Sequence, residues 1–165
     1  MIRPVRREDA AAICGIYNYY IENTSFTFEE IPLSEAEMEE RIENIIVKYP
    51  WLVMEEAGEV MGYAYVHAWR ERASYRFSAE LSVYLKNGFQ GKGRGGELLG
   101  KLLEELRKSD IHALVAGIAL PNEKSIGMVE KFGFRKIGQF REIGYKHGIW
   151  RDVGYWELIL SEGVK

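Results

Sequence analysis

The chain has 165 residues, 47% of them apolar and 28% charged, and its formal net charge is −3. This length and composition are typical of one globular domain and exclude a disordered chain. The mildly acidic charge gives no overall attraction to nucleic acid or to anionic lipid, so we expect neither as a partner. One cysteine, Cys14, leaves no internal disulfide, and no apolar run approaches the ~20 residues that span a bilayer. We therefore expect a cytoplasmic protein in which Cys14 is a packing residue.

Hydrophobic periodicity predicts two amphipathic helices in the first third of the chain. After a short strand over residues 2–5, a helix is expected to begin near Glu8 and to bury a stripe of Ile13, Ile16, Tyr17, Tyr20 and Ile21. Ser34 and Glu37 have the spacing of a capping box, in which each side chain satisfies a backbone N–H group at a helix start. Pro50 is expected to end this second helix.

The rest of the chain alternates predicted strands and helices. Strands are expected over residues 51–55, 60–69, 77–85 and 113–119, and near residues 135–141 and 155–160. One helix is expected to bury Leu98, Leu99, Leu102, Leu103 and Leu106, and another to cover residues 125–132. Hairpins followed by strand–helix–strand units predict an α+β domain around one mixed sheet. We expect this single domain to cover residues 1–165.

A glycine-rich turn, in the segment KNGFQGKGRGGELLGKLLEEL over residues 86–106, joins a predicted strand to a predicted helix. The first N–H groups of a helix lack backbone partners, and glycine lets a phosphate approach the backbone closely. Over residues 86–101 the cations Lys86, Lys92, Arg94 and Lys101 lie against one acid, Glu97. This combination predicts a phosphate-binding site; the alternative is an ordinary solvated loop.

Part of this turn fits the phosphate-binding motif of dinucleotide-binding proteins. Gly91, Gly93 and Gly96 have the spacing of the dinucleotide motif GxGxxG, but the turn lies in mid-chain and the next strand, 113–119, carries no acid to hold a ribose. A dinucleotide-dependent oxidoreductase is therefore a distant alternative. Neither GKS nor GKT follows, which argues against a nucleoside-triphosphate loop.

The pattern Gln90-x-x-Gly93-x-Gly95 resembles the pyrophosphate-binding motif of the Gcn5-related N-acetyltransferase (GNAT) superfamily. PNEKSIGMVEKFGF, residues 121–134, resembles its second cofactor segment. Residues 16–29, 62–84 and 144–152 resemble the phosphinothricin and methionine sulfoximine acetyltransferase branch. The resemblance implies a GNAT-like domain with a mixed, mostly antiparallel sheet of about six to seven strands and helices on both faces. It also implies acetyl transfer from acetyl-CoA to a small-molecule amine, with no metal.

The resemblance assigns residues to acetyl-CoA. The backbone of Val83, Tyr84 and Leu85 is expected to pair with the pantetheine arm, and the Val83 N–H to polarise the thioester carbonyl. The pyrophosphate is expected at the turn, formed by Gln90, Gly91, Lys92, Gly93, Arg94, Gly95 and Gly96. Asn122 and Ser125 take the positions of the second cofactor segment, where an asparagine contacts the pantetheine.

The acceptor side is assigned in the same way. Glu80, three residues before Val83, is the expected base, because an amine must lose a proton before it attacks a thioester. The alternative is a glutamate on the wet face of a strand. Arg70 and Tyr75 align with the substrate loop of the branch, and a guanidinium matches a carboxylate or phosphinate; an ordinary surface position is the alternative. Phe28, with Phe26, is a candidate to line the same pocket; the alternative is a core position after a helix.

Some positions depart from the superfamily or stay open. Val129 stands where many members have a tyrosine that protonates the leaving thiolate, and Tyr84 or Tyr145 are the substitutes considered. The histidines, His67, His112 and His147, show no metal-site spacing and are expected to be structural or surface groups. Trp150, Tyr155 and Trp156 are expected in the core or on the interface of a homodimer.

The resulting hypothesis is an enzyme that acetylates an amino-acid-like substrate, of the phosphinothricin or methionine sulfoximine type, by direct attack in a ternary complex. The alternatives are a protein N-terminal acetyltransferase and a CoA-binding sensor without catalysis.

Overall fold

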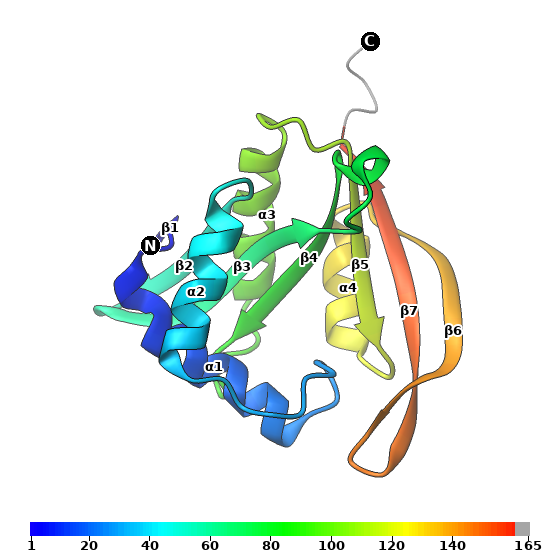
Figure 1. Cartoon of the computed structure of the whole chain (residues 1–165), viewed down its shortest axis with the longest axis horizontal. Helices are drawn as coiled ribbons and strands as arrows, with labels where there is room; N and C mark the ends of the chain where they lie inside the picture. The colour runs from blue at the N-terminus through cyan, green and yellow to red at the C-terminus, as the bar shows by residue number, and fades with distance from the viewer. Residues whose placement is uncertain (161–165) are drawn as a thin grey trace.

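The computed structural model describes residues 1–160, so residues 161–165 of the expected domain lie outside the described part. Within residues 1–160, seven strands form one sheet in the order β1-β2-β3-β4-β5-β7-β6 (Figure 1). The strands are β1 (Ile2–Pro4), β2 (Trp51–Glu56), β3 (Glu59–Ala68), β4 (Ser78–Leu85), β5 (Ala113–Ala119), β6 (Arg135–Lys146) and β7 (Ile149–Ile159). β4 and β5 are parallel and the other neighbouring pairs are antiparallel, which confirms the predicted mixed sheet.

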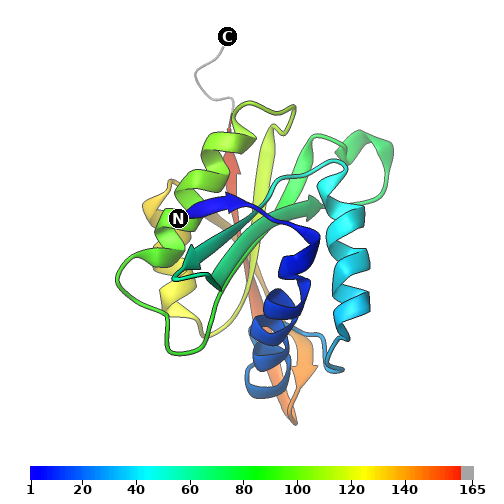
Figure 2. The same cartoon turned by 90° about the vertical axis from the view of Figure 1, so that its left-hand side faces the viewer.

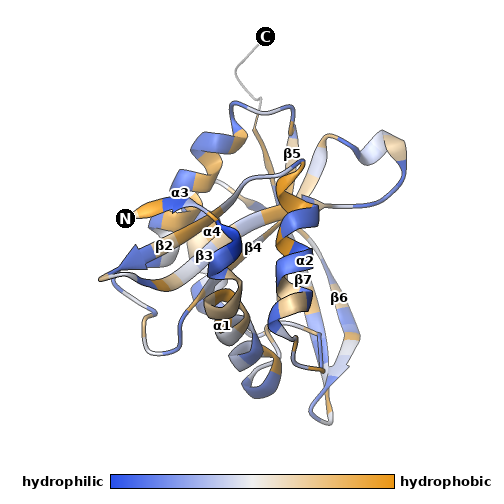
Figure 3. Ribbon diagram, turned by 60° about the vertical axis from the view of Figure 1, so that its left-hand side comes forward, coloured by the Kyte–Doolittle hydropathy of each residue, from blue (hydrophilic) through white to orange (hydrophobic). Residues whose placement is uncertain are grey.

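Helices cover both faces of the sheet, as predicted. The helices are α1 (Ala10–Asn23), α2 (Glu35–Ile46), α3 (Arg94–Leu106) and α4 (Glu123–Lys131). Figure 2 shows α1 and α2 on one side of the sheet and α3 and α4 on the other. The helices carry hydrophobic and hydrophilic residues side by side (Figure 3), and the predicted leucine stripe of α3 is buried. No helix in the described part of the chain has the length and apolarity needed to cross a membrane.

Local signals placed most element ends correctly. The capping box is present: the Glu37 N–H donates to Ser34 Oγ at 3.3 Å, and the Ser34 N–H donates to the Glu37 carboxylate at 2.7 Å. The first helix begins at Ala10, because residues 7–9 form a separate 3₁₀ turn. The second ends at Ile46, ahead of the expected Pro50.

The last two strands are much longer than predicted. β6 runs on to Lys146 and β7 begins at Ile149, so the two form a long hairpin. Their pairing shifts register between Phe140 and Gly144, where Glu142 has a φ of 49°. Such a bulge breaks the two-residue alternation that reveals a strand in sequence.

The separation of β4 from β5 positions the site. Their parallel pairing covers Ser78–Glu80 and Ala113–Val115. Beyond these residues β4 stays paired with β3, while β5 stays paired with β7. In Figure 1 the arrowheads of β4 and β5 diverge. This divergence leaves the second half of β4 with an edge that β5 does not cover.

Candidate active site

A cleft of about 1180 Å³ lies where β4 and β5 separate. It is lined by residues 80–85 of β4, the glycine turn, the start of α4 and part of the loop between α1 and α2. Pockets for drug-sized ligands reach about 1,000 Å³. The cleft therefore has room for an elongated ligand that runs from the turn to the middle of β4.

Alternate residues of β4 direct their backbone groups to opposite neighbours. The Ser78 carbonyl accepts a hydrogen bond from the Trp69 N–H on the β3 side, at 3.4 Å. The carbonyl of Phe77 accepts from the His112 N–H on the β5 side, at 2.8 Å. By this alternation, odd-numbered residues face β5. Val83 lies beyond the last β5 partner, so its N–H and C=O point into the cleft.

The residues after Val83 are placed differently. Tyr84 is even-numbered, so by the same alternation its backbone groups are directed to Tyr63 of β3, and the residue lines the cleft. The carbonyl of Leu85 already accepts a hydrogen bond from the Tyr20 hydroxyl at 2.7 Å. Among these three, Val83 therefore offers the most open backbone edge for an extended ligand.

Backbone conformation explains the glycines of the turn. Gly91 and Gly93 have φ angles of 92° and 79°, values at which a side chain is strained. Gly93 is also the N-cap of α3. The turn residues that line the cleft are Gln90, Gly91, Gly93, Arg94, Gly95 and Gly96; Lys92 lies in the turn but outside this lining. A helix start that faces a cleft and carries glycines fits an anionic ligand.

Side chains from both ends of the cleft brace this anion site. The Gln90 amide donates to Tyr20 at 3.1 Å and accepts from the Gly88 N–H at 2.9 Å, so Gln90 anchors the turn to α1. Asn122 is the N-cap of α4, and its Oδ1 accepts from the Ser125 N–H at 3.3 Å. Asn122 and Ser125 both line the cleft, as expected of the second cofactor segment.

Glu80 lies on the wall of the cleft, at the point where β4 and β5 part. Its side chain is 28% exposed. Burial raises the pKa of the carboxyl, and the charges of His67 and Arg70 partly oppose that rise. A carboxylate with a raised pKa accepts a proton more readily near neutral pH than an exposed one.

Gly117 of β5 makes room for this carboxylate. A Cβ atom at Gly117 would lie 3.1 Å from Glu80 Oε1 and 3.1 Å from the Tyr155 ring. The carboxylate is therefore packed over a bare stretch of β5, beside Tyr155 of β7. This contact could not be predicted from the sequence, because Gly117 lies in an ordinary apolar strand.

The chain is similar to known proteins over most of its length. Residues 2–154 match the acetyltransferase (GNAT) domain family. The chain belongs to this family. It is 38% identical over 156 residues to a phosphinothricin N-acetyltransferase of Streptomyces viridochromogenes, which covers 94% of this chain and 85% of the relative. It is 36% identical over 162 residues to an L-methionine sulfoximine/L-methionine sulfone acetyltransferase of Salmonella typhimurium, covering 98% and 95% of the two chains.

A solved structure agrees. The GNAT phosphinothricin acetyltransferase of Sinorhizobium meliloti, in complex with AcCoA, superposes with a TM-score of 0.95 and 36% identity. The match covers 99% of this chain and 90% of that one. The chain is therefore an acetyl-CoA-dependent N-acetyltransferase. The open edge at Val83 and the anion-binding turn fit the extended arm and the pyrophosphate of acetyl-CoA.

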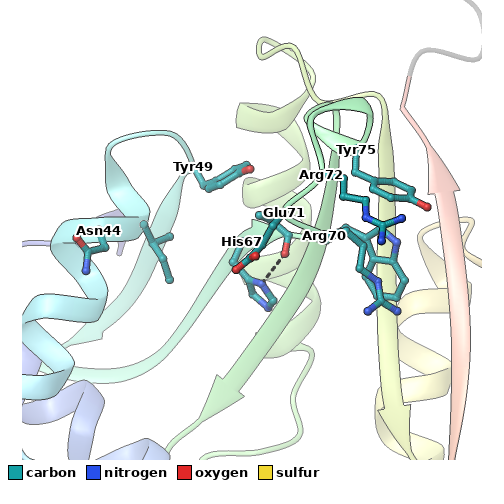
Figure 4. A pocket seen from close by; sticks show the side chains of 10 residues that line it. Asn44, Tyr49, His67, Arg70, Glu71, Arg72 and Tyr75 are labelled. Carbon is teal, nitrogen blue, oxygen red and sulfur yellow. Dashed lines mark hydrogen bonds between the residues drawn. The ribbon is translucent and has the colours of Figure 1, made fainter.

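The predicted acceptor residues of this acetyltransferase fall in two cavities. Phe28 lines the cleft, half-exposed, together with Phe26. Arg70 and Tyr75 line a second, more polar cavity of about 880 Å³ (Figure 4). Arg70 nevertheless acts on two residues of the cleft, because its charge partly opposes the rise that burial causes in the pKa values of Glu80 and Tyr155.

The loop that carries Phe28 is held by buried polar contacts that the sequence did not reveal. The Lys146 ammonium, only 1% exposed, donates to the Thr27 carbonyl at 2.8 Å. Burial lowers the pKa of this lysine. Thr27 also shares a hydrogen bond with Tyr17. These contacts dock the loop on α1 and β6, so Phe28 reaches the cleft from a fixed backbone.

Of the two tyrosines considered as substitutes for the general acid, only Tyr84 lines the cleft. Val129 is buried and, like Tyr84, lines the cleft. Burial raises the pKa of Tyr84 well above its usual value, so its hydroxyl stays protonated. Tyr145 packs against Trp150 on the β6–β7 hairpin, 4.8 Å between ring centroids, and lies outside the cleft lining.

The remaining candidates are resolved by their surroundings. Cys14 is buried and its thiol donates to the Leu33 carbonyl at 3.1 Å, which fits a packing residue. Among residues 1–160, no three His, Cys, Asp or Glu side chains form a group that could hold a metal ion. His67, expected to be structural or surface, is partly exposed and lies directly opposite Glu80. That register could not be read from the sequence, because residues 69–77 separate the two strands irregularly.

Proposed function

We propose that the enzyme acetylates the amine of a small amino-acid-like substrate that carries at least one anionic group, of the phosphinothricin or methionine sulfoximine type. The observation that carries this proposal is that the partly buried Glu80 lines one cleft with the backbone edge of Val83, while the charge of Arg70 acts on the same carboxylate. Glu80 can accept the proton of the amine, and the Arg70 guanidinium can attract an anionic group of the substrate. The names of the relatives support the same substrate class. We take residues 1–165 as one catalytic domain.

The reaction follows from this placement. Glu80 removes a proton from the substrate ammonium, and the free amine attacks the thioester carbonyl in the ternary complex. The Val83 N–H polarises that carbonyl and stabilises the charge that develops on its oxygen. The C–S bond then breaks. A thiol of pKa about 8.5 leaves readily as thiolate, and Tyr84 is the protonated group on the cleft wall that can donate to it.

Turnover measurements test the proposal. Release of free thiol from acetyl-CoA should be fast with phosphinothricin, methionine sulfoximine and methionine sulfone, and slow with neutral amines. Turnover only with peptides that have a free N-terminus would favour a protein N-terminal acetyltransferase. Tight acetyl-CoA binding without thiol release for any amine would favour a sensor.

Arg70 is expected to recognise the substrate anion. Arg70→Ala should raise the KM for an acidic amino-acid analogue by about 10- to 100-fold, the effect of losing one charge-assisted hydrogen bond. The KM for acetyl-CoA should stay unchanged. Arg72→Ala is the matched control, because Arg72 is exposed in the same cavity. An equal loss for a neutral amine without any carboxylate would assign Arg70 a structural role instead.

We propose that the enzyme is a cytoplasmic homodimer that pairs through the β6–β7 hairpin. β6 is an edge strand, and the hairpin exposes large apolar side chains at 49–59%: Ile137, Phe140, Ile143, Tyr145, Ile149 and Trp150. Such a patch is typical of a protein–protein interface. Of the three aromatic residues first considered, only Trp150 belongs to this patch. Trp156 is buried in the core and Tyr155 lines the cleft, so neither belongs to the proposed dimer interface.

Sedimentation measures the oligomeric state of the protein directly. Trp150→Glu places a charge in the patch and should shift the protein toward monomer at micromolar concentration. Lys108→Glu, an exposed charge change near the end of α3, is the control and should leave the mass unchanged. A wild-type protein that sediments as a monomer would contradict the dimer.

A further inference from the structure

His67 and Glu80 connect the two cavities. They are paired residues on β3 and β4, and His67 Nε2 lies 3.9 Å from Glu80 Oε2. Glu80 lines the acetyl-CoA cleft, whereas His67 lines the second cavity together with Asn44, Tyr49 and Arg70 (Figure 4). The pair therefore joins the reaction site to a separate opening to solvent.

The hydrogen bond of His67 to the backbone determines which ring nitrogen carries the hydrogen and which one can accept a proton from Glu80. Nδ1 lies 3.1 Å from the Ala68 carbonyl oxygen (Figure 4). A carbonyl oxygen only accepts hydrogen bonds, so Nδ1 carries the hydrogen. The neutral ring then has its lone pair on Nε2, the nitrogen nearest Glu80. His67 is thus arranged to take a proton from a protonated Glu80.

We propose that His67 accepts from Glu80 the proton removed from the substrate amine and releases it to water in the second cavity. The amine N–H bond breaks as the Glu80 O–H bond forms, and that bond breaks as Nε2–H forms. The imidazolium then loses a proton to water, so the carboxylate and the neutral imidazole are both regenerated. The 3.9 Å separation is closed by a small side-chain rotation or by one bridging water.

The neighbours of Glu80 support this route. A guanidinium does not accept a proton, so Arg70 offers no alternative route. Tyr65 and Tyr155 also lie near the carboxylate, and burial raises the pKa values of both, so they stay protonated. Imidazole exchanges protons near neutral pH. With acetyl-CoA and substrate filling the cleft, a route through His67 lets Glu80 lose its proton before products leave.

The proposal rests on Glu80 as the base, and chemical rescue tests it separately. His67→Ala should lower kcat by about 10-fold at saturating substrates, with both KM values unchanged. Added imidazole should enter the open second cavity and restore kcat, in proportion to its neutral form. His67→Gln, which fills the site but accepts no proton, should show the same loss with less rescue. His147→Asn removes an imidazole from the β6–β7 turn and should change nothing.

The outcomes of these measurements distinguish proton transfer by His67 from a structural role of this residue. Wild-type kcat in His67→Ala, without dependence on buffer concentration, would remove His67 from the proton route. A loss that imidazole does not restore, or a raised KM in both variants, would make His67 a structural residue. If Glu80→Gln is fully active, the base assignment itself fails. If Glu80→Gln is inactive while His67→Ala is unaffected, only the route through His67 fails.

Discussion

Glu80→Gln is expected to lower kcat by about 10²-fold or more, with little change in acetyl-CoA affinity. Glutamine has nearly the same shape and still holds a water, but it accepts no proton at working pH. Because burial raises the pKa of Glu80, the wild-type rate should fall as pH drops through that raised value, where the base becomes protonated. The defect of the variant should shrink as pH rises, since more amine arrives already deprotonated.

Thermal stability separates this role from a structural one. A carboxyl whose pKa is raised by folding contributes stability that is fully present below its unfolded pKa and is lost as pH rises through the folded value. At pH 8 the ionised Glu80 is therefore a cost, and Glu80→Gln should leave Tm unchanged or higher. A lowered Tm with a defect independent of pH would indicate a structural residue.

The pH–rate profile of both proteins from pH 6 to about 9.5, at saturating acetyl-CoA, decides the assignment. Glu71→Gln is the control, because Glu71 is exposed in the second cavity and should give the wild-type profile. Parallel profiles for wild type and Glu80→Gln would remove Glu80 from the base role.

The sequence alone was sufficient to predict the features that depend on residues close together along the chain. The Ser34 capping box, the leucine stripe of α3 and the strand–turn–helix around Gly93 each rest on contacts within a few residues. The glycine turn at the start of α3 was predictable for the same reason, since a helix start and its glycines are local features. That this turn binds the pyrophosphate stays a prediction.

Contacts across the sheet could not be predicted in this way. His67 meets Glu80 only because of the β3–β4 register, and Gly117 matters only because Glu80 reaches across β5. Lys146 holds the Thr27 carbonyl from 119 residues away. The position of Arg70 in a second cavity likewise could be seen only in the folded structure. Residue types indicated the chemistry, whereas register and burial determined which residues meet.

Gly93→Ala is expected to weaken acetyl-CoA binding by at least about 10-fold. Gly93 lines the cleft, and no protein atom lies within 4 Å of a Cβ added there, so the new methyl group would project into open space where the pyrophosphate is expected. Valine would obstruct the phosphate more, but a β-branched residue at a φ of 79° also strains the helix start. Alanine therefore gives the cleaner test.

Gly88→Ala is the matched control for backbone strain. Gly88 has a φ of 81° and equally open surroundings, but it lies outside the cleft lining. Both variants should lose about 1–2 kcal/mol of unfolding free energy, because alanine is disfavoured in the left-handed region. Calorimetry should then show weakened acetyl-CoA binding for Gly93→Ala alone. Equal affinity in both variants would mean that the pyrophosphate binds elsewhere, since strain is matched and only the approach to the turn differs.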